Sequence, residues 1–193
     1  MNPFPEQYRA ELLRAIDAID LEKVGSLIEL FGEARAAGRR IFVCGNGGSA
    51  ATASHFACDI GKGASVQGRR FRILALTDQM PTITAYSNDL SYEFVFVEQL
   101  KNFAEPGDLV MALSGSGNSP NVLRAIEYAN SIGCRTIALT GRDGGKLGPL
   151  AELNIRVPVP HMGRIEDAHM IICHMIGYYF MEHGPDPAVP PSS

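Results

Sequence analysis

The sequence predicts a three-layer α/β domain, in which helices cover both faces of a five-stranded parallel sheet. Short unbroken apolar runs alternate along the chain with stretches of helical periodicity, which is typical of strands buried on both faces. Turns rich in glycine and serine follow two of these runs directly, and in a parallel sheet such turns open on the same edge. A chain of 193 residues, 46% of them apolar, suits a single domain, which we expect to span residues 1–183.

The segment before the first strand, about residues 5–37, carries apolar side chains at helical intervals and ends at Gly38. It predicts an extra N-terminal helical element, made of one long helix or of two. Because no strand precedes it, this element is not a crossover between strands. We expect it to cover an edge of the sheet or to pack on another subunit.

Five apolar runs predict the five strands of the sheet. These runs are residues 40–44, 71–76, 108–113, 135–140 and 154–158. Helices are predicted from residue 49 onward, over about 80–86 and 92–103, from residue 120 onward, and over about 164–182. Residues 61–70 are interpreted as a basic loop that contains glycine, and Asn88 and Asp89 as a turn. The proline-rich tail, residues 184–193, has no apolar period and is predicted to be disordered.

Charge and cysteine content disfavour several classes of function. The net charge is −4, without the basic stripe that a sequence-independent nucleic-acid binder needs. The amino terminus does not resemble a signal peptide, and no apolar run is long enough to cross a membrane. Four cysteines lack the spacing of a disulfide scaffold or a zinc site and are interpreted as core thiols in a reducing cytoplasm: Cys44, Cys58, Cys134 and Cys173. The expected partner is a small molecule or a protein, not nucleic acid or a membrane.

The stretch from Cys44 to Asp59, CGNGGSAATASHFACD, joins a strand, a glycine turn and a helix. Unpaired backbone N–H groups and the helix dipole favour an anion at such a helix start, so a phosphorylated ligand is expected there. The turn also fits the loose dinucleotide pattern GxGxxA. However, no acidic residue ends a second strand about twenty residues farther on, which disfavours a dinucleotide site.

A second loop, from Ser114 to Ser119, brings three hydroxyl groups and two glycines to the start of the helix that Pro120 opens. Ser119 alone could serve only as the N-cap of this helix. Three hydroxyl groups together with free N–H groups favour a phosphate-binding role for the loop, because these donors match the several acceptor oxygens of a phosphate.

Two pairs of possible metal ligands or proton carriers lie on predicted helices. His55 and Asp59 are four residues apart and share one helix face. Glu166 and His174 lie near one stripe of the last helix, two turns apart. Exposed helices often carry such residues without a site, so the spacing alone does not establish one. Two residues on a neighbouring stripe are interpreted as packing or capping: His169 and Cys173.

Five separated motifs occur in one order along the chain, and they are CGNGGSAATASHF, the SND of Ser87 to Asp89, LSGSGNSPNV, ALTGRDGGKLGPLAELNIRVP and RIEDAHMIICHMI. In this combination the chain resembles the sugar isomerase (SIS) domain family, and within it the phosphoheptose isomerases, over about residues 12–182. The resemblance implies a flavodoxin-like SIS fold, a phosphorylated sugar substrate, and a homotetramer assembled through the terminal helices.

Carried over by position, the resemblance also implies site residues and one zinc ion per subunit. The implied sugar-phosphate contacts are Asn46, Gly47, Gly48, Asn88, Asp89, Ser114, Gly115, Ser116, Ser119 and Glu166. The implied zinc ligands are His55, Asp59, Glu166 and His174. Asp59 and His174 are the implied catalytic pair.

The implied reaction is conversion of D-sedoheptulose 7-phosphate into D-glycero-D-manno-heptose 7-phosphate. Such aldose–ketose interconversion requires a base that moves a proton between adjacent carbons and an acid that moves one between their oxygens. Which of Asp59 and His174 is the base stays open. One alternative is a non-catalytic tetramer of the same family that regulates replication initiation through a protein partner and lacks the second histidine. Another is an isomerase for a different phosphosugar.

Three positions depart from the family pattern. Asp59 stands where the family usually has glutamate, Glu166 where it has glutamine, and Gly163 where it has an acidic residue. Because Asp59 is one methylene shorter, either the helices lie closer together or the metal carries more of the chemistry. Glu166 adds a negative charge that favours a divalent cation, and Gly163 removes an expected contact to a sugar hydroxyl.

Overall fold

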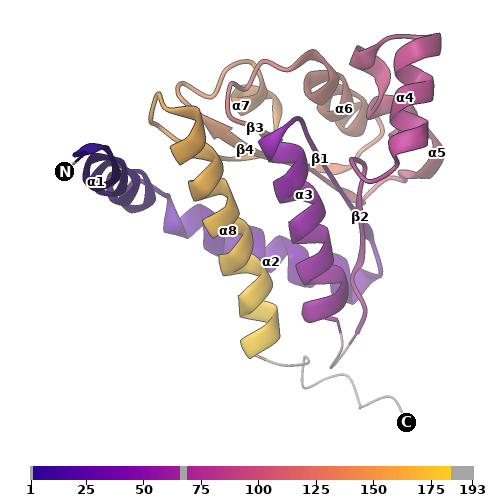
Figure 1. Ribbon diagram of the computed structural model, residues 1–193. Coiled ribbons are helices and arrows are strands. Elements are labelled where there is room, and N and C mark those ends of the chain that lie inside the picture. The colour runs from indigo at the N-terminus through magenta and orange to yellow at the C-terminus, as the bar shows by residue number, and fades with distance from the viewer. Residues whose placement is uncertain (1, 66–68, 184–193) are drawn as a thin grey trace.

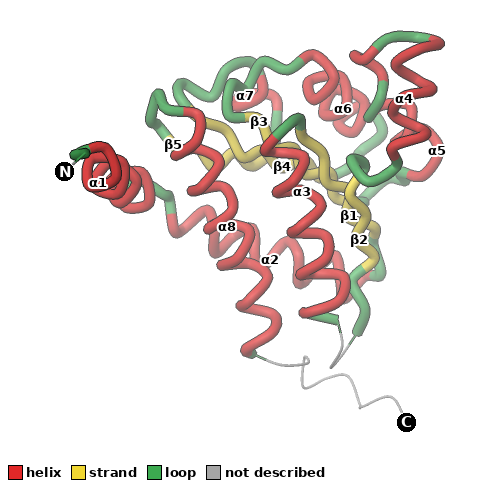
Figure 2. Tube along the Cα trace, viewed as in Figure 1, coloured by secondary structure: helices red, strands yellow, loops and turns green. Residues whose placement is uncertain are grey.

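The structure is a computed structural model that describes residues 2–65 and 69–183. Within these residues, five strands form one parallel sheet in the order β2-β1-β3-β4-β5. The strands are β1 (Arg40–Gly45), β2 (Arg72–Ala75), β3 (Leu109–Ser114), β4 (Arg135–Gly141) and β5 (Leu153–Val157). Helices lie on both faces of the sheet (Figure 1; Figure 2). The predicted fold class is therefore confirmed, whereas the predicted disordered tail, residues 184–193, lies outside the described residues.

The strands are buried on both faces because their side chains alternate between two apolar cores. In β1, Ile41 and Val43 belong to one core, and Phe42 and Cys44 to the other. The first core is covered by α2 (Leu21–Ala37), α3 (Gly48–Cys58) and α8 (Met162–Glu182), with α1 (Phe4–Asp17) packed on α8. The second is covered by α4 (Met80–Asp89), α5 (Val97–Phe103), α6 (Pro120–Ser131) and α7 (Leu147–Leu150).

The N-terminal segment forms two helices, which is one of the two arrangements that the sequence predicts. Asp20 caps α2 by accepting a hydrogen bond from the Lys23 N–H at 3.1 Å. The helix ends at Gly38, as the sequence predicts, and Gly38 has the left-handed conformation that is common at helix ends. α2 contacts the edge strand β5, whereas α1 extends away from the sheet and packs on α8 (Figure 1). The Tyr8 hydroxyl there donates to Asp167 Oδ2 at 2.6 Å.

Several boundaries differ from those that the sequence predicts. Residues 92–103 form a short 3₁₀ turn, Tyr92–Phe94, and then α5, because the hydroxyl of Ser91 caps the turn. Asn88 and Asp89 end α4 instead of forming a turn, since helical hydrogen bonding continues up to the N–H of Leu90. The short helix α7 was not predicted.

The predicted loop 61–70 begins as a helix, since a π-helix, Asp59–Gly63, continues α3. Residues 66–68 of this loop lie outside the described residues. The interpretation of all four cysteines as core thiols is wrong for Cys58, which lies at the exposed end of α3, while the other three are buried. Nowhere in the described ranges does a helix combine the length and the apolar character needed to cross a bilayer.

Candidate active site

The two predicted phosphate-binding turns lie next to each other at the carboxyl edge of the sheet. β1 and β3 are neighbouring strands, and Gly45 at the end of β1 pairs with Leu113 near the end of β3. From β1 the chain continues to β2 on one side and from β3 to β4 on the other. This is the topological switch point at which open α/β sheets bind their ligands.

The turn after β1 depends on glycine at three positions. Gly47 has φ +55° and ψ −121°, a conformation that residues with a Cβ rarely adopt, and it precedes α3 directly. A Cβ on Gly45 would lie 2.9 Å from the carbonyl oxygen of Leu113, so β1 and β3 approach closely here. A Cβ on Gly48 would lie 2.5 Å from Glu166 Oε2, so this carboxylate lies against the start of α3. The turn therefore brings the N-terminus of α3 and Glu166 of α8 together.

The side chain of Asn46 is held by two residues that the sequence reasoning missed. Asn46 Nδ2 donates to Asn121 Oδ1 at 2.8 Å, and Asn121 Nδ2 donates back to Asn46 Oδ1 at 2.9 Å. The hydroxyl of Tyr92 donates to the same Asn46 oxygen at 2.7 Å. Asn121 lies one residue beyond Pro120 in the motif LSGSGNSPNV, which was the available signal, whereas the sequence near Tyr92 carried none.

The serine loop after β3 gathers its three hydroxyl groups. Ser114 Oγ lies 3.5 Å from Ser116 Oγ and 3.4 Å from Ser119 Oγ. The N–H of Gly117 donates to Ser114 Oγ at 3.2 Å, which fixes the turn at Gly115 to Gly117. Ser119 is the N-cap residue of α6, but its side chain makes no capping hydrogen bond. Ser116 and Ser119 are partly exposed, whereas Ser114 is buried beneath them, and capping does not account for Ser119.

Asn88 and Asp89 are exposed at the end of α4, where Asn88 Nδ2 donates to Asp89 Oδ1 at 2.8 Å. Their predicted contact with a sugar stays a prediction, because no contact in the described chain joins them to the two turns.

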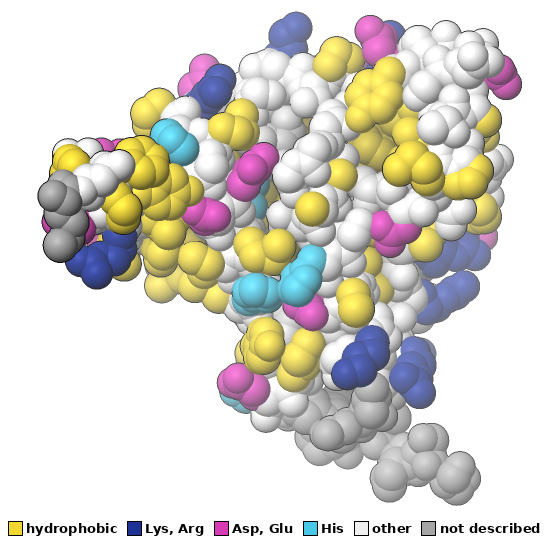
Figure 3. Space-filling model, in the orientation of Figure 1, with side chains coloured by type: hydrophobic (Ala, Val, Ile, Leu, Met, Phe, Trp, Pro, Cys, Tyr) yellow, Lys and Arg dark blue, Asp and Glu magenta, His cyan; other side chains and the backbone are white. Residues whose placement is uncertain are grey.

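His55, Asp59 and His174 form a cluster where α3 and α8 pack together. His55 Nε2 lies 3.2 Å from Asp59 Oδ2 and 3.0 Å from His174 Nε2, and His174 Nε2 lies 3.8 Å from Asp59 Oδ2. The side chains of the two histidines are 49% and 42% exposed, and Figure 3 shows histidine and acidic side chains gathered on the face of the molecule that α3 and α8 form. The cluster is therefore open to a ligand.

The donor set of this cluster fits a zinc ion. One ligand atom from each of its three residues lies within 4.8 Å of the others. Two imidazole nitrogens and one carboxylate oxygen suit Zn²⁺, and catalytic zinc sites typically have three protein ligands and one open position. Glu166, the fourth ligand implied by the resemblance, is not part of this group. It precedes His174 by two turns of α8, roughly 12 Å of helix, and lies beside Gly48.

The position of the shorter carboxylate follows from the packing of α3 on α8. Asp59 begins the π-helix that continues α3, and π-helical turns often occur at functional sites. Opposite it on α8 is Gly177, where an added Cβ would lie 3.6 Å from Asp59 Cβ. The two backbones can approach at this point because Gly177 has no side chain. That the helices lie closer here than where the family has glutamate stays a prediction.

His169 and Cys173 have the packing role that the sequence predicts. His169 is 1% exposed, and its Nε2 lies 3.0 Å from the carbonyl oxygen of Thr140. Burial lowers the pKa of His169 to about 4, so the ring is neutral at pH 7. Cys173 is fully buried, and burial raises the pKa of its thiol. Neither residue belongs to the cluster.

Comparisons with known proteins show the family to which the chain belongs. The SIS domain family model matches residues 6–141. A probable phosphoheptose isomerase of Thermoplasma volcanium is 41% identical over 164 residues, which cover 84% of this chain and 82% of the relative. The phosphoheptose isomerase of Geobacter sulfurreducens is 38% identical, with 86% and 88% covered.

A solved structure is also similar, that of a phosphoheptose isomerase from Neisseria gonorrhoeae. It superposes with a TM-score of 0.84 at 32% identity, over 91% of this chain and 95% of that one. The chain therefore belongs to the SIS domain family, within which these relatives are phosphoheptose isomerases.

Proposed function

We propose that the chain is an aldose–ketose isomerase that converts D-sedoheptulose 7-phosphate into D-glycero-D-manno-heptose 7-phosphate. The observation that carries this proposal is the cluster of His55, Asp59 and His174, which unites two imidazoles and a carboxylate in a chain whose relatives are phosphoheptose isomerases. The alternative of a non-catalytic SIS tetramer is disfavoured, because the second histidine is present and lies within the cluster.

The serine loop and the start of α3 would bind the phosphate. Hydroxyl groups of Ser114, Ser116 and Ser119 and the free N–H groups of α3 offer donors to its oxygens. Asn46, held by Asn121 and Tyr92, would orient the sugar hydroxyls next to this phosphate. These contacts fix the substrate, and fixed orientation is itself a large part of catalysis.

The cluster would perform the proton transfers. Asp59 and His174 can each accept and return a proton, one between the two reacting carbons and the other between their oxygens. His55 contacts both groups and orients them. We propose that these three residues hold one zinc ion, which when bound would polarise the substrate carbonyl. Glu166, beside Gly48, is assigned to the sugar-phosphate contacts.

We propose a homotetramer, located in the cytoplasm. Large apolar side chains are exposed on two helices. They are Phe4 and Leu13 on α1, and Met162, Tyr178 and Tyr179 on α8. The ring of Tyr178 lies 5.9 Å from that of His174, so this apolar surface borders the cluster. Another subunit packed on α1 and α8 would cover the apolar surface and enclose the cluster. Light scattering is expected to give four times the chain mass of 20.8 kDa, and a monomer at micromolar concentration would contradict the tetramer.

The activity is tested by incubating the purified protein with a panel of phosphorylated ketoses and following aldose formation. We expect turnover of sedoheptulose 7-phosphate and none of unphosphorylated sedoheptulose. Equal rates on both sugars would refute the phosphate-binding role of the two turns. Turnover of another phosphosugar alone would retain the isomerase and change its substrate. Zinc is measured by elemental analysis of the protein before and after treatment with a chelator, alongside its rate.

A further inference from the structure

The start of α8 packs against both of the turns that are assigned to the phosphate. A Cβ on Gly115 would lie 2.5 Å from Met162 Sδ and 3.3 Å from Ile165 Cγ2, so the first turn of α8 lies directly against the serine loop. The next residue, Glu166, lies against Gly48 at the start of α3. A displacement of the start of α8 would therefore reach both turns.

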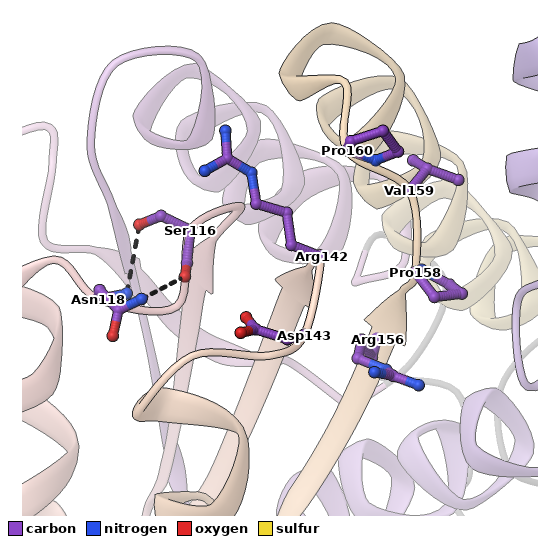
Figure 4. Close-up of a pocket in the computed structure, with 8 residues that line it drawn as sticks. All are labelled: Ser116, Asn118, Arg142, Asp143, Arg156, Pro158, Val159 and Pro160. Atoms are coloured by element: carbon purple, nitrogen blue, oxygen red, sulfur yellow. Dashed lines mark hydrogen bonds between the residues drawn. The ribbon is translucent and has the colours of Figure 1, made fainter.

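The segment that leads into α8 does not share this contact with the serine loop. Figure 4 shows Pro158, Val159 and Pro160 on one side of a pocket, and Ser116 and Asn118 of the serine loop on the other side. The volume of this pocket is about 670 Å³. The support that the serine loop receives from this part of the chain therefore comes from the first turn of α8 itself.

On its other side, the start of α8 is held by α1. The Tyr8 hydroxyl donates to Asp167 Oδ2 at 2.6 Å, and Glu11 forms an ion pair with a guanidinium of α8. This guanidinium belongs to Arg164, and its Cζ lies 4.9 Å from the centre of the Tyr8 ring. Arg164 is only 9% exposed, and a buried charge is costly without a partner, so its contacts with α1 stabilise the charge. Residues 162–167 are therefore held between α1 and the two turns.

The position of Tyr8 depends on the glycine at position 163. A Cβ on Gly163 would lie 3.1 Å from the Tyr8 hydroxyl oxygen, which is closer than an ordinary contact, and 3.3 Å from the ring of His161. The His161 ring itself packs edge-on against the Tyr8 ring, with the ring centres 5.7 Å apart. Gly163, which is one of the departures from the family pattern, therefore makes room for the Tyr8 hydroxyl against α8.

We propose that Tyr8 is a positioning residue for substrate binding, which together with Glu11 holds the start of α8 against the serine loop and the start of α3. This inference rests on the proposed function, because it concerns the binding of the phosphosugar. Tyr8 acts through α8, and His174 of the cluster lies about two turns beyond Asp167 on that helix. Loss of the Tyr8 hydroxyl should therefore raise KM and leave kcat unchanged.

The test is steady-state kinetics with sedoheptulose 7-phosphate, at a temperature well below the melting temperature of each variant. Tyr8→Phe removes one hydrogen bond and keeps the ring, so KM should rise by about fivefold while kcat stays unchanged. Tyr128→Phe, which removes a tyrosine hydroxyl on α6, is the matched control and should leave KM unchanged. Glu11→Gln should also raise KM, whereas Glu6→Gln on the same helix should not.

A double variant tests the packing of Tyr8 against Gly163. Gly163→Ala should raise KM in the wild-type chain, because the added Cβ displaces the Tyr8 hydroxyl. In the Tyr8→Phe background the same substitution should cause no further rise, since the hydroxyl is absent. If the two effects on KM multiply in the double variant, the two residues act independently and the proposal is overturned.

Hydrogen–deuterium exchange adds a measurement that needs no substrate. Tyr8→Phe should raise amide exchange in residues 162–167 and in the serine loop, compared with Tyr128→Phe. If the wild type isomerises no phosphosugar, the proposed function fails, and the exchange of the serine loop alone decides whether α1 positions it. In an active enzyme, a KM of Tyr8→Phe equal to that of Tyr128→Phe overturns this proposal alone. A smaller assembly of Tyr8→Phe in light scattering would also overturn it, because Tyr8 would then act through contacts between subunits.

Discussion

Replacing Asp59 by glutamate tests whether the carboxylate is matched to the spacing of α3 and α8. The extra methylene adds about 1.5 Å of reach. Asp59 Oδ2 already lies 3.2 Å from His55 Nε2. With the backbone of α3 in place, the longer side chain therefore moves its carboxylate relative to His55 by roughly 1 Å or more. A displacement of this size costs about 10²-fold in rate, so we expect kcat of Asp59→Glu to fall by about that factor.

The assay is steady-state conversion of sedoheptulose 7-phosphate, with bound zinc measured on the same samples. Asp59→Glu is expected to keep its zinc and its KM, because the charge and the phosphate contacts are unchanged. Asp59→Asn is the matched control, which keeps the length and removes the charge, and should lose both zinc and activity. A value of kcat for Asp59→Glu equal to or above that of the wild type would refute the reasoning, because it would show that the helices leave room for glutamate.

Three further outcomes are expected. Ser116→Ala should raise KM for the phosphorylated substrate by about tenfold, with unchanged thermal melting, because it removes one hydroxyl donor; an unchanged KM would exclude Ser116 from the phosphate contacts. Tyr92→Phe should lower kcat/KM by several-fold, because Asn46 loses one of its two partners, worth about 1 kcal/mol; equal kinetics would show that Asn121 suffices. The pKa of folded His169 lies below the ordinary value of 6.5, because the buried ring is costly to protonate. The free energy of unfolding should therefore be highest above pH 6.5 and fall by about 3 kcal/mol toward pH 4. Urea unfolding of the wild type and of His169→Gln at pH 7 and pH 4 measures this loss, which His169→Gln should not show.

The fold was predictable because its signals are local and repeated. Each strand is an apolar run that glycine, proline or charge ends, and Gly38 and Pro120 mark helix boundaries that the structure retains. The errors fall where one local hydrogen bond or a rare type of helix decides. Ser91 shortens a predicted helix by capping a 3₁₀ turn, and the π-helix from Asp59 extends another into a predicted loop. Neither has a periodic pattern, so neither can be predicted from one sequence.

The site was predictable in its parts but not in its assembly. Spacing placed His55 with Asp59, and the serine loop with a helix start, because both relations lie within one element. The 3.0 Å approach of His174 to His55 joins residues on two different helices, and only the crossing of α3 and α8 creates it. The same crossing separates Glu166 from the cluster, since a straight helix that delivers His174 to Asp59 must carry Glu166 two turns away to Gly48. In the proposed function, a stripe of possible ligands on one helix would therefore serve two sites, with a proton carrier at one end and a substrate contact at the other. Glu166→Gln should accordingly change KM for the phosphosugar and leave the amount of bound zinc unchanged, whereas His174→Ala should lower the zinc content. Loss of zinc in Glu166→Gln would show that Glu166 is a zinc ligand after all.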